Sequence, residues 1–282
     1  MSPVFSVVGT KGGCGKSTTA ISLSIWLSKL RPKRWVLLVD GDQFVRTVQL
    51  KLCQRVEATL ADVLRDREPL ERSVHLCDLD DAKTKKPLFP NLAVLPASRE
   101  GGEFLPEVVG RHHDYLMGLA QRFDEMVGRL RRRFEWIVVD TPASFSAEHL
   151  VLTGVADAVI YVVTPDRDSI EATKRTAEGL NSYLGLRTLG VVVNRLPEGE
   201  DSGVWVERAG TIGEVLGVVP EDPTVEEAFR RDLPVVVVDP ECPASRAFRE
   251  VAERVLRARI PPSGLREKVE RAVELEEREL RG

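Results

Sequence analysis

Short runs of apolar, β-branched residues recur along this chain, and few polar residues interrupt them. The apolar positions are continuous instead of alternating, which is typical of strands in a parallel sheet that helices cover on both faces. Stretches with helical spacing separate the runs. Such alternation predicts an α/β fold with a doubly wound, mostly parallel sheet flanked by helices. We expect strands at 4–9, 35–40, 92–96, 136–140, 157–163, 189–194 and 216–220, and helices at 17–30, 59–66, 113–133, 168–184, 224–231 and 244–259.

The alternation continues without a low-complexity linker, so we predict one domain over residues 1–260. Residues 78–90 are polar with prolines near their end, which indicates a surface excursion too short to join two domains. The segment 261–282 begins at a Pro-Pro pair and is rich in charge. We expect it to form a charged C-terminal helix or tail with a weak apolar stripe.

Ligands of such sheets bind at the carboxyl ends of the strands, where helix N-termini and free backbone groups converge. Charged, hydroxyl or amide residues leave several of the expected strands at this edge. They lie in the segments Gly9-Thr-Lys-Gly-Gly, Asp40-Gly-Asp42, Asp140-Thr-Pro, Thr164-Pro-Asp and Asn194-Arg. These groups suit a nucleotide and its metal ion.

A glycine-rich segment, GTKGGCGKSTT at residues 9–19, joins the first expected strand to the first expected helix. That context is the one a phosphate-binding P-loop requires. Glycines let backbone N–H groups approach phosphate oxygens, and the N-terminus of the following helix adds partial positive charge. We expect Lys16 to neutralise the β- and γ-phosphates and the Ser17 hydroxyl to ligate Mg²⁺. The remaining phosphate-binding positions of this loop are Gly12, Gly13, Cys14, Gly15 and Thr18.

Lys11 gives the loop a second lysine, and the string Lys11-Gly-Gly-Cys-Gly-Lys-Ser resembles the deviant Walker A motif of the MinD/ParA family, in the SIMIBI class of P-loop ATPases. The resemblance covers nearly the whole chain, and the segments TLADVL and VPED make it closer to the MinD branch. It implies ATP and Mg²⁺ as cofactors and a homodimer that forms when ATP binds. It also implies that Lys11 reaches the phosphates of the partner subunit, so that Lys11 and Lys16 both serve catalysis. A second ammonium group supports the charge that develops during phosphoryl transfer.

Aspartates follow two of the expected strands, at positions where the family carries functional carboxylates. Asp40 and Asp42 occupy the switch I position. Asp40 is expected to hold a magnesium-bound water, and Asp42 to position the attacking water as a weak general base. Asp140 closes the run WIVVD as a Walker B carboxylate does. The expected metal set is therefore Ser17, Asp40 and Asp140, which suits an ion that keeps much of its hydration shell.

The chain departs from the patterns of these proteins in its loops. Thr10 stands where the strict P-loop motif has glycine, and the switch I continuation from Gln43 matches neither branch of the family. Ser144 replaces a glycine of switch II, whose backbone amide would face the γ-phosphate.

The expected base site lies beyond two later strands. Asn194 ends one of them, and its amide offers both a donor and an acceptor to an adenine edge. In the family, the equivalent Asn and the loop around a following Pro form the adenine site. We therefore assign base binding to Asn194, Arg195, Pro220, Glu221 and Asp222, and we expect ATP instead of GTP because the sequence has no NKxD-like element.

Composition limits where such a protein acts. The net charge of −4 gives no global positive field, so a surface for DNA or anionic lipid would have to be local. The sequence shows no secretory signal, no bilayer-spanning run and no CxxC pair among its four cysteines. We expect a cytoplasmic protein that is at most peripheral at a membrane or the nucleoid.

Two charged segments bear on that choice of surface. The cluster Arg129, Arg131, Arg132 and Arg133 can contact nucleic-acid phosphates but is more typical of a solvated helix end. Residues 265–282 contain six Glu, five Lys or Arg and no aromatic residue, which is not the composition of a membrane-binding helix.

The expected function is an ATP-driven switch. ATP joins two protomers, the dimer binds a surface or partner, and slow hydrolysis separates the protomers, which positions cellular cargo or the cell-division machinery. An activating protein is the expected partner. A chromosome-partitioning ATPase whose ATP dimer coats DNA is the main alternative. An iron–sulfur carrier, disfavoured by the missing CxxC, and a small-molecule kinase or ligase are more remote.

Overall fold

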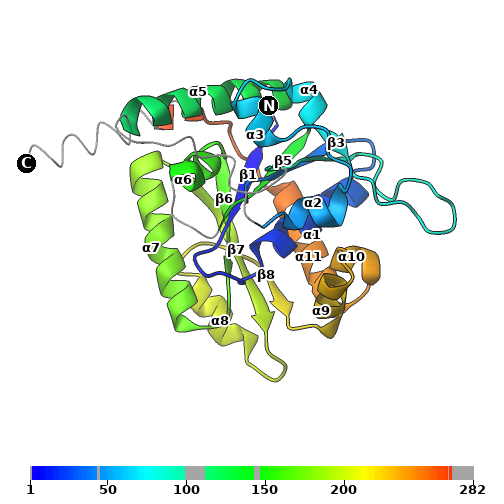
Figure 1. Ribbon diagram of the computed structural model, residues 1–282. Helices are drawn as coiled ribbons and strands as arrows, with labels where there is room; N and C mark the ends of the chain where they lie inside the picture. The colour runs from blue at the N-terminus through cyan, green and yellow to red at the C-terminus, as the bar shows by residue number, and fades with distance from the viewer. Residues whose placement is uncertain (1, 43–44, 99–111, 143–146, 266, 269–282) are drawn as a thin grey trace, which may run out of the picture.

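A computed structural model of the 282-residue chain describes residues 2–42, 45–98, 112–142, 147–265 and 267–268, and for residues 112–117, 119 and 147–150 it describes the backbone alone. One central sheet runs through the molecule, with helices on both of its faces (Figure 1). Among the described residues, no helix is long and apolar enough to cross a bilayer.

The sheet has eight strands in the order β3-β4-β2-β5-β1-β6-β7-β8. Every neighbouring pair is parallel except β3 and β4. The predicted doubly wound, mostly parallel sheet is therefore confirmed, and each expected strand is present. Only the short edge strand β3 was not predicted. The strands are β1 (Val4–Val8), β2 (Val36–Asp40), β3 (His75–Leu76), β4 (Leu92–Leu95), β5 (Trp136–Asp140), β6 (Ala158–Val163), β7 (Arg187–Leu196) and β8 (Val215–Pro220).

The helices follow the strands and divide between the two faces of the sheet. Helices α1, α2, α10 and α11 pack on one face, and α3, α5, α6, α7 and α8 pack on the other. Their bounds are α1 (Lys16–Leu30), α2 (Thr47–Leu52), α3 (Leu60–Leu64), α4 (Leu70–Ser73), α5 (His112–Leu130), α6 (Ala147–Gly154), α7 (Arg167–Leu184), α8 (Ser202–Ala209), α9 (Pro223–Arg230), α10 (Val235–Val238) and α11 (Pro243–Arg257).

Burial on both faces explains the continuous apolar runs. Phe5 and Val7 of β1 pack toward α1 and α11, whereas Val4 and Val8, which flank them, pack toward the opposite helices. Successive side chains of a strand point to opposite faces, so a strand covered on both faces has no solvent side for a polar residue. The central strand β1 is buried along its whole length.

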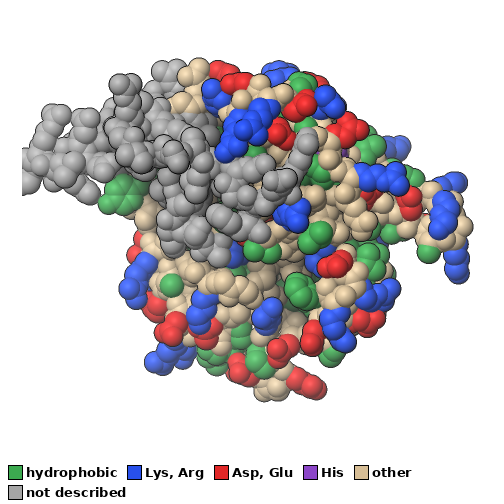
Figure 2. Space-filling view, viewed as in Figure 1, with side chains coloured by type: hydrophobic (Ala, Val, Ile, Leu, Met, Phe, Trp, Pro, Cys, Tyr) green, Lys and Arg blue, Asp and Glu red, His purple; other side chains and the backbone are tan. Residues whose placement is uncertain are grey.

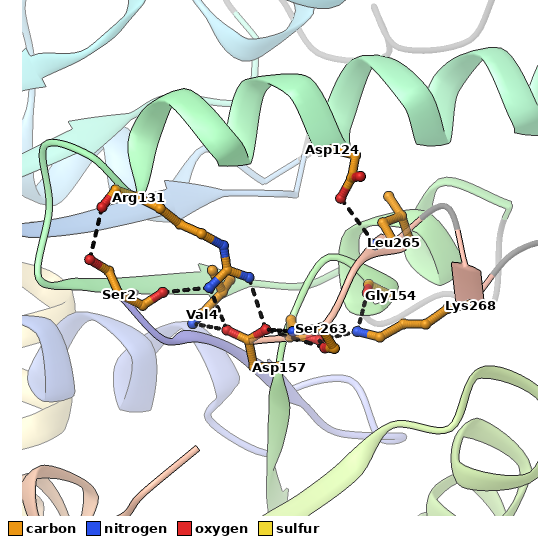
Figure 3. Close-up of polar contacts among 10 residues, drawn as sticks. Ser2, Val4, Asp124, Arg131, Gly154, Asp157, Ser263, Leu265 and Lys268 are labelled. Atoms are coloured by element: carbon orange, nitrogen blue, oxygen red, sulfur yellow. Dashed lines mark hydrogen bonds and ion pairs between the residues drawn. The ribbon is translucent and has the colours of Figure 1, made fainter. Parts of the chain in front are cut away.

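The last described residues, 261–265 and 267–268, lie against the amino ends of β1 and β6, where they complete a buried polar network (Figure 3). Its centre is Asp157, whose carboxylate accepts two hydrogen bonds from Arg131, at 2.7 and 2.8 Å, and one from the Val4 N–H at 2.8 Å. The N–H of Ser263 donates to the same carboxylate at 2.6 Å. Lys268 donates to the carbonyls of Gly154 and Ala156 at the end of α6.

This network corrects one prediction about the arginine cluster. The Arg131 side chain is 10% exposed and forms a buried ion pair, so it is not part of a solvated helix end and does not face a nucleic acid. Arg129 pairs with Glu71 at the surface. The start of the predicted C-terminal tail is a packed strap on the domain. Residues 269–282, where the rest of that tail was predicted, lie outside the described residues.

Candidate functional site

The loop between β1 and α1 needs glycine for its shape. Gly13 and Gly15 have positive φ values of 76° and 99°, a conformation that other residues rarely adopt. A Cβ on Gly15 would lie 2.1 Å from the amide nitrogen of Asn194. Gly15 directly precedes α1, which has no side-chain cap and no acidic residue in its first turn. The free N–H groups and the positive end of the helix dipole therefore face the loop, as an anion site requires.

The two lysines of the loop lie in different surroundings. Lys16 is 7% exposed and lies close enough to Asp140 to lower the pKa of that carboxyl. The Lys11 side chain is 47% exposed, and its Nζ lies 2.8 Å from Oδ1 of Asp166. The hydrogen bond to Asp166 raises the pKa of Lys11. Lys16 is thus built into the site of its own chain, whereas Lys11 lies at the surface.

Asp166 holds Lys11 through an arrangement that the sequence did not reveal. It is the N-cap of α7, accepts from the Ser169 N–H at 2.8 Å, and receives a further hydrogen bond of 2.6 Å from the Thr164 hydroxyl. Burial alone would raise the pKa of Asp166, but these donors and Lys11 lower it. One indication of this arrangement was present in the sequence: the segment Thr164-Pro-Asp directly follows an expected strand.

Asp40 and Asp140 are neighbours across the sheet, in register at the ends of β2 and β5. Each is 1% exposed. One oxygen of Asp40 and both oxygens of Asp140 are buried without a hydrogen-bond partner among the described residues. Buried polar atoms normally have partners, so these carboxylates are arranged for a group from outside the chain.

The electrostatics of the pair agree with that conclusion. Burial, with a smaller contribution from the charge of Asp42, raises the pKa of Asp140 to about 7, although the Ser17 hydroxyl and Lys16 oppose the shift. Burial and the neighbouring Asp140 raise the pKa of Asp40 well above its usual value. A divalent cation would favour the charged form of both groups. Two carboxylates and a hydroxyl fit Mg²⁺, which keeps several waters and takes phosphate oxygens as further ligands.

Asp42 lies beside this pair, in the turn that follows β2. Its N–H donates to Oδ1 of Asp40 at 3.1 Å, and its own Oδ1 accepts from the Val45 N–H at 3.0 Å. The side chain is partly exposed, unlike Asp40 and Asp140. Gln43 and Ser144, where the chain departs from the family patterns, lie outside the described residues.

A cavity of about 680 Å³ begins at Gly15 and Thr18 and extends between α1 and the ends of β7 and β8. The residues assigned to base binding all line it: Asn194, Arg195, Pro220, Glu221 and Asp222. The structure therefore brings them to the same site as the phosphate loop, although 175 or more residues separate them in sequence. Asp222 shapes the wall, because its carboxylate caps α9 and also accepts from the Ala244 N–H at 3.0 Å.

Asn194 makes a contact that the sequence did not predict. Its Nδ2 donates to the Cys14 carbonyl at 2.8 Å, and the residue is 5% exposed. The amide is thus bonded to the phosphate loop, which leaves its oxygen and its second hydrogen for a base. Lys51 and Phe229, farther along the cavity, were missed because neither belongs to a motif.

Comparison with known proteins agrees with this arrangement. An uncharacterized ATP-binding protein of Methanocaldococcus jannaschii is 29% identical over 265 residues, which are 92% of this chain and 89% of the relative. The septum site-determining protein MinD of Synechocystis is 27% identical over 268 residues, 93% of this chain and 92% of the relative. The structure of MinD from Pyrococcus horikoshii, complexed with Mg-ADP, superimposes with a TM-score of 0.74 at 27% identity and covers 91% of this chain and 97% of that chain.

A family model matches residues 5–235, which include the phosphate loop, Asp40, Asp140 and the base cavity. That span is most of the 282-residue chain. The chain belongs to the CobQ/CobB/MinD/ParA nucleotide-binding domain family.

Proposed function

We propose that this protein is an ATP-dependent dimerising switch of the MinD/ParA type, which binds Mg-ATP and hydrolyses it slowly. The carrying observation is the contrast between the two lysines of one phosphate loop. Lys16 is buried beside Asp140, whereas Lys11 lies at the surface, where it pairs with the partly exposed Asp166. A lysine in that position is free to leave its surface pair for the phosphates of a second protomer, because exposed ion pairs are weak.

Within one protomer, separate groups bind the phosphates, the metal ion and the attacking water. Lys16 and the free N–H groups at the start of α1 bind the β- and γ-phosphates, and Ser17, Asp40 and Asp140 hold the metal directly or through water. Mg²⁺, when bound, neutralises the phosphate oxygens and orients them for in-line attack. Asp42 orients the attacking water at the edge of the site. Catalysis by positioning alone is slow, which suits a timing device more than a metabolic enzyme.

The dimer completes what a single protomer lacks. Lys11 of each protomer crosses to the triphosphate of the partner subunit and supports the charge that develops during transfer. Because Lys11 binds Asp166 in the single chain, dimerisation exchanges that surface pair for a contact with phosphate. The relatives named MinD favour a role in positioning the division machinery or another cargo, through an activating partner protein. This role places the protein in the cytoplasm, with peripheral binding to a membrane or the nucleoid.

Light scattering after size exclusion, with and without Mg-ATP, tests the proposal. Lys16→Ala should abolish nucleotide binding, whereas Lys11→Ala should keep binding but lose both the dimer and phosphate release. Lys33→Ala is the matched control, because Lys33 is exposed and remote from the loop. Asp42→Ala should accumulate the ATP dimer.

An unchanged ATP-dependent dimer in Lys11→Ala would contradict the assignment of Lys11, and a monomeric Asp42→Ala protein in ATP would contradict the switch. Sedimentation of the Asp42→Ala dimer with anionic liposomes, and separately with DNA at low and high salt, decides between the membrane and the chromosome-partitioning alternatives. Binding to DNA phosphates weakens steeply as salt rises.

A further inference from the structure

The cavity extends past the residues assigned to the base. Its outer part lies between α1, α2 and α9, and its walls are mostly apolar. Its polar lining includes Lys51, Glu226 and Ser22, and the hydroxyl of Ser22 is buried and has no hydrogen-bond partner within the described part of the chain. An apolar chamber with one unsatisfied hydroxyl suits a flat ligand that carries a few polar edge atoms.

Phe229 forms the mouth of this chamber. It is 69% exposed, although Ala228 beside it on α9 is buried at 2%. A phenylalanine this exposed leaves a large apolar area in contact with water, and α9 does not need the ring for its own packing. The ring lines the same cavity as Gly15 and Thr18 of the phosphate loop. An aromatic face on a ligand cavity is a stacking surface for a planar group.

The ammonium group of Lys51, on α2, lies over the ring of Phe229. It is 8% exposed, and its Nζ lies 5.3 Å from the centre of the Phe229 ring and 3.4 Å from the carbonyl oxygen of Leu233. No carboxylate forms an ion pair with Lys51 within the described ranges. Burial lowers the pKa of Lys51, which the charge of Asp232 partly opposes. The ammonium therefore has the ring and one carbonyl as its partners, and a cation over an aromatic face holds it in place.

We propose that Phe229 is a base-binding residue that stacks on the nucleobase at the outer wall of the cavity, and that Lys51 is the positioning residue that orients its ring. The inference rests on the proposed binding of ATP and adds a base contact from α9 that no motif marks. Lys51 lies on α2, which begins five residues after Asp42.

Calorimetric titration with two probes tests the proposal: Mg-ATP, which has a base, and magnesium tripolyphosphate, which has none. Phe229→Ala should weaken the affinity for Mg-ATP about tenfold, which is the effect of one base–aromatic stack. The affinity for tripolyphosphate should not change. Phe229→Trp should keep wild-type affinity for ATP, and its added emission should be quenched by ATP but not by tripolyphosphate. Leu76→Ala is the matched control, since Leu76 is 62% exposed on β3, outside the cavity.

Lys51 is tested by the same titrations. Lys51→Met should weaken the binding of Mg-ATP but not that of tripolyphosphate. Lys51→Arg, which keeps the cation, should retain the wild-type affinity for Mg-ATP. Equal weakening of both probes by either variant would show a general loss of the site and overturn the stacking role. Unchanged ATP affinity in Phe229→Ala would overturn it as well, with the proposed function intact. A wild-type protein that binds neither probe would instead refute the proposed function.

Discussion

Replacement of Arg131 by Met should destabilise this protein far more than the loss of an ordinary ion pair. The Asp157 side chain is 0% exposed and that of Arg131 10%, so the pair is shielded from water. The methionine keeps the apolar stem of the side chain but removes the two guanidinium hydrogen bonds to Asp157 and a third to the Ser2 carbonyl. The carboxylate then retains the N–H groups of Val4 and Ser263 and the hydroxyl of Ser263 (Figure 3).

The magnitude follows from the charge that is left behind. Removal of one partner of a buried pair typically costs about 3–5 kcal/mol, because the other charge stays buried without compensation. The retained donors and the nearby Lys268 place this case near the lower end, at about 3 kcal/mol. Domains of this kind are stable by only about 5–15 kcal/mol, so the loss is large.

Urea unfolding, followed by circular dichroism, measures the effect. Asp157→Asn combined with Arg131→Met should recover part of the loss, because a neutral amide has no buried charge to compensate. Arg231→Met is the control: Arg231 pairs with Glu227 on α9 at 3.0 Å, with both side chains about half exposed, and should change stability by less than about 1 kcal/mol. If Arg131→Met costs no more than Arg231→Met, the strap and its ion pair do not stabilise the fold as argued.

Three further outcomes follow from the site. In metal-free protein, burial raises the pKa of Asp140 to about 7, so the folded state holds a proton that the unfolded chain releases, and stability should fall as pH rises from about 4 to 7. Asp140→Asn should remove the contribution of Asp140 to this fall, up to about 4 kcal/mol, and abolish magnesium-dependent ATP binding; identical unfolding curves for both proteins at pH 5 and 7.5 would contradict the argument. Asp166→Asn keeps the cap of α7 but releases Lys11, and should lower the ATP concentration needed for dimerisation by a few-fold at low salt; an unchanged midpoint in light scattering would exclude a restraining role. Asn194→Ala removes the hydrogen bond to the Cys14 carbonyl in the phosphate loop, so it should weaken the binding of tripolyphosphate as well as that of ATP. If Asn194 contacted the base alone, only the binding of ATP would weaken.

The sequence predicts this fold well because the fold depends on pattern. Continuous apolar runs bury on both sides of a sheet, and the loop at 9–19 is constrained by its glycines. Asp40 and Asp140 lie side by side because parallel strands end at one edge, as the strand ends indicated. Helices such as α2 and α8 were missed because they are short and bury few residues, which leaves little periodicity to detect.

What the sequence could not predict depends on side chains that meet across long separations. The ion pair of Arg131 with Asp157 and the contact of Lys51 with Phe229 join segments that no local pattern relates. A run of arginines gives the same local pattern whether it is solvated or buried, so the burial of Arg131 is seen only in the packing of residues 261–265 and 267–268. Asn194 was assigned to the base from its position, and its bond to the phosphate loop depends on the close approach of Gly15.

The buried carboxylates connect stability with function. Asp40 and Asp140 destabilise the protein without ligand at neutral pH, since buried oxygens of both carboxylates have no hydrogen-bond partner among the described residues. The same deficit makes Mg-ATP binding release protons below about pH 7, and the binding free energy must exceed the cost of that deprotonation. A ligand that binds only the folded state stabilises it by mass action, so the gain in melting temperature on adding Mg-ATP should grow with pH between 5 and 7.5. ATP without magnesium leaves the carboxylates uncompensated beside the phosphates and should give a smaller gain with the opposite pH trend. With these two trends, the proposed site would take the metal–nucleotide complex as one ligand.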